Sequence, residues 1–480
     1  MDSVIAKAAG VLGVPDDLLR IAFCIIASFP LCSVVKRIPT TKLVWKDGVI
    51  LAAGIFYLVG IFQLYLSTLF LLATALVTYV LAIWMPQNRQ MPTFNFYTQM
   101  ALMLATHCIE QFGGDDFVNN IGISGTQMIM LQKLTSYAWD VYDGTRAPEK
   151  LQAQQLESRI TVQPSFLRYL SWLFFFPTVL TGPACTFNEY NSWLDMSMYK
   201  DLRTITGEPL KRAPHSGVAL WSKLGEALMW VFMYTQFGSL FPDYQLYNHG
   251  WYMDLSVVRR LLTVYVLALV YRTKYYSAWL LSEAACIHSG LGFSGTTPDK
   301  KKMRWDRMKN VSPMSVETAQ NFHGIFASWN IITSHWLRNY VYLRVTPEGK
   351  KPGTKSTFIT FATSAIWHGT RPGYYLTFVL GAVYQTFGKV FRRSIRPVFL
   401  NSSKKWAYDF VCLVVTQFSL SFAVMPFILL DLGPSFRLWA SLYFYPIVGL
   451  MLSWVIILGP LSSYVMPKLN LLSRDLKKTD

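Results

Sequence analysis

The chain has 480 residues, of which 52% are hydrophobic and only 15% are charged. Soluble domains average about 25% charged residues, so this composition excludes an ordinary soluble protein and predicts a membrane protein. The formal net charge is +17, and the basic side chains gather in short loops around residues 36–46, 300–309 and 350–355. The positive-inside rule places such loops on the cytosolic side, where they also meet anionic membrane lipid.

Apolar stretches along the chain predict the membrane spans. A helix needs roughly 20 apolar residues to cross a hydrocarbon core of about 30 Å, and residues 48–66 and 67–85 meet this requirement most clearly. Shorter or interrupted stretches lie at residues 21–35, 96–112, 166–180, 220–241, 261–271, 277–291, 358–368, 374–387, 408–430 and 438–458. Since several of these are weak, we expect about eleven spans in all.

The sequence favours a single membrane domain over residues 1–480, because it contains neither an internal repeat nor a polar stretch long enough for a separate soluble domain. Its longest polar segment, residues 143–164, is expected to be an exposed loop or a surface helix. Residues 126–142 have apolar side chains at helical spacing but include Lys133 and Asp140. We therefore expect this segment either inside a helical bundle or along the membrane interface.

Both ends of the chain bear on its location. The first twenty residues lack a basic region that leads into an apolar stretch and a cleavage site, so no removable signal peptide is predicted. The first hydrophobic span is then expected to target the chain. Residues 461–480 form a short basic tail that ends in KKTD, which fits a dilysine retrieval signal and indicates a multi-pass protein of the endoplasmic reticulum membrane.

The most informative segment is residues 364–389, an apolar stretch interrupted by His368 and Arg371. An ionisable residue in a membrane span indicates a functional site, although an isolated buried histidine more often just binds a backbone carbonyl. Here the sequence GTRPG directly after His368 breaks the helix. Broken backbone at membrane depth is tolerated only around a cavity filled by water or ligand. The pattern therefore favours a functional role for His368.

Polar residues upstream extend this pattern. Asn330 follows Trp329 in a largely apolar segment, and a buried amide there needs hydrogen-bond partners. It either joins neighbouring helices or belongs to a site. Further upstream, Trp305, Asp306 and Glu317 lie in a strongly basic segment, which suits a polyanion arriving from the cytosol or simply forms a charged loop.

These motifs resemble those of a known family. Trp305-Asp306, Trp329-Asn330 with Trp336-Leu337, and Trp367-His368-Gly369 with Gly373-Tyr374-Tyr375 occur in this order. The set resembles the membrane-bound O-acyltransferase family. Segments such as KMRWDRMKNVSPMSVETAQN and IWHGTRPGYYLTF are similar to the fungal lysophospholipid acyltransferases of that family, and the resemblance covers nearly the whole chain. The long charged tail that is common in fungal relatives is not found in this sequence.

The resemblance implies an all-α bundle of about eleven transmembrane helices that encloses a catalytic chamber, with acyl-CoA entering from the cytosol. It implies that Asn330 and His368 are the paired catalytic residues. A neutral imidazole, with a reference pKa of about 6.5, takes the proton of the acceptor hydroxyl as that oxygen attacks the thioester carbon, and an apolar chamber disfavours its charged form. Asn330 either donates its amide N–H to the thioester oxygen or positions a substrate.

The remaining site predictions concern substrate binding. The forked guanidinium groups of Arg304 and Arg307 suit the phosphates of CoA. Arg371 either binds the phosphate of the acceptor or extends to the membrane interface, and Tyr374 either lines an acyl tunnel or only packs. The predicted substrate-binding set is completed by Trp305, Asp306, Trp329 and Glu317.

The predicted partners are acyl-CoA, a lysophospholipid and membrane lipid, with no nucleic acid and with the oligomeric state left open. Acyl-CoA is a co-substrate, and no cofactor is expected. No metal site is expected either, because the six cysteines lie mostly in apolar stretches and lack metal-ligand spacing. No serine or cysteine occupies a matching motif position, so a covalent acyl-enzyme is not required.

Three alternatives remain at this point. His249 and Asp254 have the His-x4-Asp spacing of the glycerol-phosphate acyltransferase family, but the phosphate-binding block that accompanies it there is absent from the sequence. A polytopic transporter also places polar residues at broken helices. Its two halves are expected to be related in sequence, and the two halves of this sequence show no similarity. A family member that acylates a sterol or a protein is disfavoured by the resemblance to the lysophospholipid branch.

Overall fold

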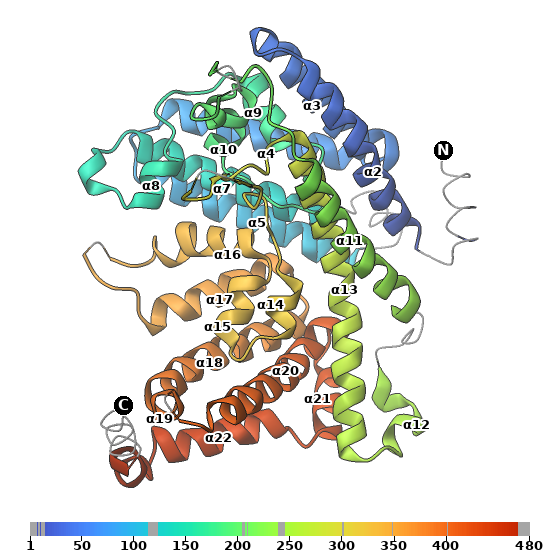
Figure 1. The fold of residues 1–480 in the computed structure, drawn as a ribbon, viewed down its shortest axis with the longest axis vertical. Helices are drawn as coiled ribbons and strands as arrows, with labels where there is room; N and C mark the ends of the chain where they lie inside the picture. The colour runs from blue at the N-terminus through green and yellow to red at the C-terminus, as the bar shows by residue number, and fades with distance from the viewer. Residues whose placement is uncertain are drawn as a thin grey trace. The chain divides into compact units, whose positions relative to one another are not determined.

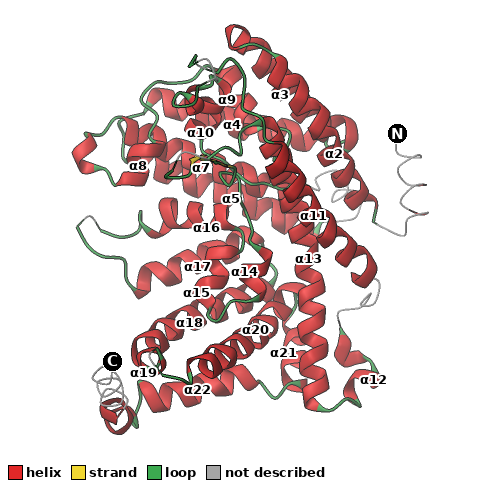
Figure 2. Cartoon of the chain, viewed as in Figure 1, coloured by secondary structure: helices red, strands yellow, loops and turns green. Residues whose placement is uncertain are grey.

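A computed structural model describes residues 15–113, 123–203, 210–238, 245–299, 302–347, 349–400 and 402–468, together with residues 7, 10, 207 and 208. The described chain is almost entirely helix and loop, as Figure 2 shows, so the all-α prediction is confirmed. The two described strands, β1 (Gly295–Thr296) and β2 (Met303–Arg304), form a small antiparallel hairpin with Gly295 opposite Arg304.

The helices are labelled in Figure 1. In chain order they are α2 (Asp16–Arg37), α3 (Leu43–Phe56), α4 (Tyr65–Trp84), α5 (Gln90–Phe112), α7 (Ser124–Gly144), α8 (Ala153–Ser158), α9 (Phe166–Leu173), α10 (Phe187–Leu194), α11 (Gly217–Gly238), α12 (Gly250–Met253), α13 (Val257–Ser289), α14 (Pro313–Glu317), α15 (Phe322–Ser328), α16 (Ile331–Leu337), α17 (Thr354–His368), α18 (Pro372–Ser394), α19 (Arg396–Phe399), α20 (Lys405–Leu429), α21 (Leu432–Ser441) and α22 (Tyr445–Ile457). Short 3₁₀ or π turns occur at η1 (Thr40–Lys42), η2 (Tyr57–Ile61), η3 (Pro148–Lys150), η4 (Ser197–Tyr199), η5 (Leu246–Asn248) and η6 (Arg338–Tyr342).

The chain folds into two compact units. Unit 1 comprises Met1–Trp230, Tyr275–Val311 and His335–Tyr340. Unit 2 comprises Val231–Lys274, Ser312–Ser334 and Val341–Asp480. Helix α13 contributes its first half to unit 2 and its second half to unit 1.

Membrane-spanning character is clearest in a few helices. Among the described residues, four segments are long and apolar enough to span: Asp16–Arg37, Thr40–Ile61, Tyr65–Trp84 and Lys405–Leu429. The pair α21 and α22, bent by 74°, gives a fifth if it counts as one span. Helices α5 and α7 are long enough but bury polar side chains, among them Asn95 and Lys133. The total of eleven therefore stays a prediction.

Helix α7 shows how unit 1 buries such polar groups. Lys133 is 1% exposed, and its Nζ donates to the carbonyl oxygens of Trp172, at 2.8 Å, and Leu173, at 3.2 Å. Asp140 is also buried and accepts hydrogen bonds from Ser158 and Tyr340. Because a buried charge is tolerated only with such partners, this segment lies inside the helical bundle of unit 1.

The polar segment that follows α7 is partly structured. It begins in the last turn of α7 and includes η3 and α8. Most of its side chains are exposed or half-buried, but Asp143, Leu151 and Ile160 are buried. The backbone of Ile160 lies so close to Gly144 that a Cβ there would come within 1.8 Å of the Ile160 oxygen.

The main hydrophobic core of unit 2 is built from α18, α20 and α21, together with η5, α12 and the first half of α13. Thr377 on α18 donates to the carbonyl oxygen of Ala423 on α20, at 2.8 Å. Phe422 on α20 stacks on Trp439 of α21, with ring centroids 4.8 Å apart and an interplanar angle of 8°. These contacts hold α20 against α18 on one side and against α21 on the other.

Candidate active site

His368 is the last residue of α17. Gly369 ends the helix with φ at +133°, a conformation that glycine adopts without steric cost. Pro372 then begins α18 at a position where its missing N–H is not needed. The helix break predicted from GTRPG is confirmed, and it places His368 at a chain reversal.

Aromatic rings surround the His368 imidazole. Phe378 of α18 stacks on it, with centroids 5.0 Å apart at 24°. Phe427 of α20 meets it edge to face at 5.0 Å and 82°, and Trp367 does so at 4.7 Å and 74°. The Tyr374 ring lies 5.8 Å from the imidazole and 4.8 Å from the Phe427 ring. Rings on two neighbouring helices thus fix the orientation of the imidazole.

Close backbone packing also supports this turn. The N–H of Gly373 donates to the Leu430 oxygen at 2.6 Å. A Cβ at Gly373 would lie 2.0 Å from the Pro426 oxygen and 2.7 Å from the Leu430 oxygen. Only glycine therefore allows the start of α18 to approach the end of α20 this closely.

Asn330 lies at a second break in unit 2, between α15 and α16. Its φ is +44°, in the left-handed region that asparagine tolerates better than most residues. Its carbonyl oxygen accepts the Ser334 N–H at 2.9 Å. Trp329, directly before it, packs against the cluster of Val316, Ala319, Ile325 and Leu420.

Helix α15, which leads into Asn330, packs on both helices that flank His368. Phe326 meets Phe361 of α17 edge to face at 5.4 Å. Phe322 stacks on Tyr384 of α18, with centroids 4.3 Å apart at 20°. Within unit 2, the helix that leads into Asn330 therefore packs on the same two helices that meet at the turn after His368.

Glu317 is engaged by an arginine. Its two carboxylate oxygens accept from Nε and Nη2 of Arg272 on α13, at 2.8 and 2.6 Å. Arg272 is 3% exposed and Glu317 is 12% exposed. The neighbouring backbone is held as well, since Gln417 of α20 donates to the Val316 oxygen at 2.7 Å. This bidentate pair fixes α14 ahead of α15.

We expect Glu317→Ala to destabilise the fold, because it leaves a buried guanidinium without this carboxylate. Breaking a buried ion pair by removing one partner costs about 3–5 kcal/mol. The matched control is Asp409→Ala, which breaks the more exposed pair of Asp409 with Lys405 on α20 and should cost at most about 1 kcal/mol. Thermal unfolding of the purified proteins measures both. Equal stability of the two variants, with activity lost only in Glu317→Ala, would instead support the predicted substrate contact.

Arg371 forms a half-exposed ion pair with Asp431, at 3.4 Å. Asp431 lies between α20 and α21, so the pair joins the start of α18 to the end of α20. Exposed pairs of this kind contribute about 0–1 kcal/mol. The guanidinium can therefore exchange this partner for a phosphate at little cost, and both roles predicted for Arg371 stay predictions.

The remaining predicted residues lie in unit 1, around β2. Asp306 accepts hydrogen bonds from the Ser294 hydroxyl and from Nη2 of Arg304. Burial alone would raise the pKa of the Asp306 carboxyl, but these hydrogen bonds and the Arg304 charge lower it below its ordinary value. The Trp305 ring meets Phe293 edge to face at 5.8 Å. Asp306 therefore stays ionised and bound to Arg304.

The cations predicted to bind CoA phosphates already have acidic partners. Arg304 pairs with Asp306 at 3.0 Å, and Nη1 of Arg307 pairs with Glu189 at 3.1 Å. Each would have to exchange its carboxylate for a phosphate. Lys300 and Lys301, at the start of the predicted basic cluster, lie outside the described residues.

The rival His-x4-Asp pair brackets a single helical turn in unit 2. His249 precedes the four-residue helix α12, and Asp254 follows it. The Asp254 side chain is exposed. His249 stacks loosely on Trp251, with centroids 6.3 Å apart at 25°. In the part of the chain that the structure describes, no three His, Cys, Asp or Glu side chains are grouped so as to hold a metal ion.

Phe427 is the site residue that sequence reasoning missed. It follows Pro426 in a long apolar stretch and belongs to none of the motifs. Its only sequence signal is that it is aromatic, which is common in this chain. Its contact with His368 depends on how α20 packs against α18.

Comparison with known proteins places the chain among acyltransferases. A lysophospholipid acyltransferase of Saccharomyces cerevisiae is 37% identical over 97% of this chain and 78% of its own length. One of Schizosaccharomyces pombe is 35% identical over 96% of this chain and 90% of its own length. The human membrane-bound glycerophospholipid O-acyltransferase 1 is 30% identical over 98% and 95%, respectively. The family profile described as MBOAT, membrane-bound O-acyltransferase family, matches residues 56–428, and the chain belongs to this family.

Proposed function

We propose that this protein transfers an acyl chain from acyl-CoA to the free hydroxyl of a lysophospholipid, with His368 as general base. The observation that carries the proposal is similarity over nearly the full chain to two fungal proteins named lysophospholipid acyltransferase. The aromatic enclosure of His368 at a helix break supports its role, because a base must be held in one orientation to be effective.

The chemistry needs only the groups already named. The hydroxyl oxygen of the acceptor attacks the thioester carbon while the imidazole of His368 takes the hydroxyl proton. The carbon–sulfur bond then breaks, and the CoA sulfur leaves as a thiol after it receives that proton. Asn330 donates its amide N–H to the thioester oxygen, where negative charge develops, or holds a substrate in place. No metal, cofactor or covalent intermediate takes part.

The protein is a multi-pass membrane protein, and the proposal also covers the number of its spans, its location and the route by which acyl-CoA reaches it. The bundle has about eleven spans and encloses the chamber in which the two substrates meet. The endoplasmic reticulum membrane is the proposed location. Acyl-CoA reaches the chamber from the cytosol.

The choice of acceptor is tested on purified protein with labelled oleoyl-CoA. The acceptors are lysophosphatidic acid, lysophosphatidylcholine, lysophosphatidylethanolamine and lysophosphatidylserine, each supplied separately, with a sterol and a peptide as controls. We expect labelled diacyl phospholipid from more than one lysophospholipid and none from the controls. Label transferred to the sterol or the peptide alone would show that the acceptor class is wrong even within this family.

A further inference from the structure

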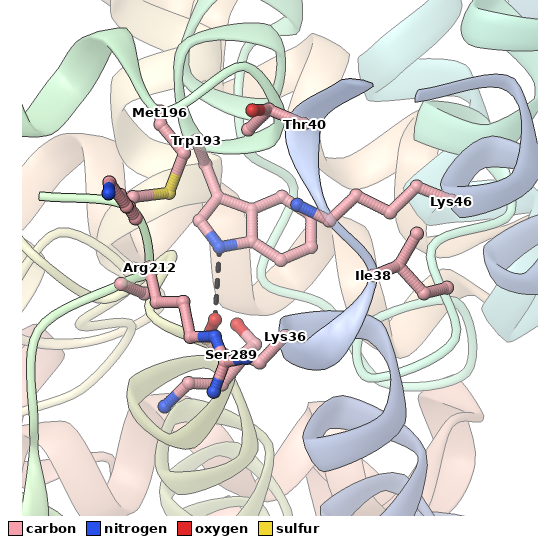
Figure 3. A pocket seen from close by; sticks show the side chains of 10 residues that line it. Lys36, Ile38, Thr40, Lys46, Trp193, Met196, Arg212 and Ser289 are labelled. Carbon is pink, nitrogen blue, oxygen red and sulfur yellow. Dashed lines mark hydrogen bonds between the residues drawn. The ribbon is translucent and has the colours of Figure 1, made fainter. Parts of the chain in front are cut away.

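A pocket in unit 1 is lined by four cationic side chains. Lys36 comes from the end of α2, Lys46 from α3, and Lys211 and Arg212 from the segment that precedes α11. Figure 3 shows Trp193 of α10 at the centre of the pocket, with Lys36, Lys46 and Arg212 arranged around it. None of the ten described residues that line the pocket is acidic.

The two inner lysines are held in place by partners that carry no charge of their own. Nζ of Lys36 donates to the His288 carbonyl oxygen at 3.0 Å. Nζ of Lys46 donates to the Leu194 carbonyl oxygen at 3.3 Å and lies 5.9 Å from the centre of the Trp193 ring. Carbonyl and ring partners carry no net charge. Both side chains therefore contribute fixed positive charge to the pocket.

The carboxylates close to Lys46 are themselves engaged. Asp47 accepts from Nε of Arg168 at 2.7 Å and from the Ser171 hydroxyl at 2.6 Å. Asp195, whose charge also acts on Lys46, is exposed and accepts the Ser197 N–H at 2.8 Å. Neither side chain lines the pocket, so the charged side chains that line it are all basic.

Lys211 and Arg212 differ from the other cations of unit 1 considered above. Both are exposed, and within the described part of the chain neither forms a hydrogen bond or an ion pair. Arg304 and Arg307, in contrast, already have carboxylate partners. An anion at this pocket thus meets two free cations and displaces no existing pair.

The size of the pocket decides where such an anion binds. The enclosed volume is about 10 Å³, which is room for about one water molecule and too little for a phosphate group. A phosphate must therefore lie at the mouth, where the flexible side chains of Lys211 and Arg212 can close around it. The guanidinium fork of Arg212 matches two phosphate oxygens.

We propose that this pocket binds a phosphate group at its mouth, contacted by Lys211 and Arg212 and attracted by the fixed charges of Lys36 and Lys46. Two kinds of phosphate-bearing ligand are available to a membrane protein at this pocket. One is CoA, which rests on the function proposed above, and the other is the head group of an anionic phospholipid, which does not.

The test uses the purified full chain in nanodiscs and the double variant Lys211→Ala/Arg212→Ala. The matched control is Lys350→Ala/Lys351→Ala, which removes the same charge from an exposed loop of unit 2. One arm measures binding of coenzyme A to protein in phosphatidylcholine discs. The other measures phosphatidic acid retained from mixed discs by native mass spectrometry. Because both substituted side chains are exposed and unpaired, the variant is expected to fold like the wild type.

We expect the double variant to weaken one of the two ligands at least tenfold, since a hydrogen bond to a charged group contributes about a factor of ten or more in affinity. The control should change neither. The affected arm identifies the ligand. Equal binding by variant and control in both arms overturns the proposal. Since neither arm requires turnover, this failure is distinct from a failure of the proposed acyl transfer, which the acceptor assay reports.

Discussion

Replacing His368 with alanine is expected to abolish acyl transfer while leaving folded protein. Loss of a positioned general base costs a factor of about 100 to 10,000. The proposed chamber excludes water and offers no substitute base, so the loss should reach the upper end of this range. The measurement is turnover per folded molecule at matched protein levels, because removing a partly buried residue that packs against four aromatic rings can also destabilise the bundle and imitate catalytic loss.

The internal control is His249→Ala. His249 lies at the start of the single-turn helix α12, in the rival His-x4-Asp pair, and it should be far less important for turnover. If His249→Ala were inactive while a well-folded His368→Ala retained near-normal activity, the base would be assigned to the wrong histidine. Phe427→Leu should lower turnover less than His368→Ala does. It removes the ring that meets the imidazole edge to face but leaves the imidazole itself in place.

Asn330→Ala is expected to lower turnover by about 100 to 1,000 fold if the amide donates to the developing oxyanion. A fall in kcat with little change in KM indicates this transition-state role, whereas a raised KM with unchanged kcat indicates substrate positioning. The kinetics are measured with saturating acyl-CoA and varied acceptor, and then in the reverse arrangement.

The backbone at Asn330 requires a second variant. Because its φ is +44°, alanine introduces strain in addition to removing the amide, whereas glycine adopts this conformation freely. Asn330→Gly should therefore restore stability but leave turnover low. Recovery of full activity in Asn330→Gly would mean that only the backbone conformation matters and that the amide has no chemical part.

Local backbone chemistry made the turn at His368 predictable. Gly369 and Pro372 determine the conformation of their own residues, so the end of α17 and the start of α18 follow from the sequence alone. The break at Asn330 was not predicted. A single asparagine in an apolar segment gives only a weak preference for the left-handed region, and packing of α15 decides the outcome.

Contacts between segments that are distant in the sequence were harder to predict. The charge of Glu317 is evident from the sequence, but its partner Arg272 lies 45 residues earlier in a helix with other polar residues. The location of Lys133 was equally hard to predict, because the carbonyl oxygens that accept its hydrogen bonds belong to the distant residues Trp172 and Leu173. Backbone acceptors have no sequence signature, so periodicity could not separate a buried helix from one along the interface.

The number of membrane spans is hard to predict from hydropathy, because the partners of buried polar side chains cannot be recognised in the sequence. Helix α4 is apolar along its length, and its predicted bounds lie within two residues of the observed ones. Helix α7 is long enough to span but buries polar side chains inside the bundle. In a membrane protein with an internal site, hydropathy therefore identifies the most apolar helices and underestimates those that carry polar groups inward.

The most direct test of acyl transfer from acyl-CoA to a lysophospholipid is the stoichiometry of the reaction in purified protein. Released CoA thiol and newly formed diacyl phospholipid are measured in the same sample with labelled oleoyl-CoA. The proposed chemistry predicts one thiol released for each phospholipid formed, with both signals lost in His368→Ala. Phospholipid formed without thiol release, or thiol released without label in any phospholipid, would contradict it.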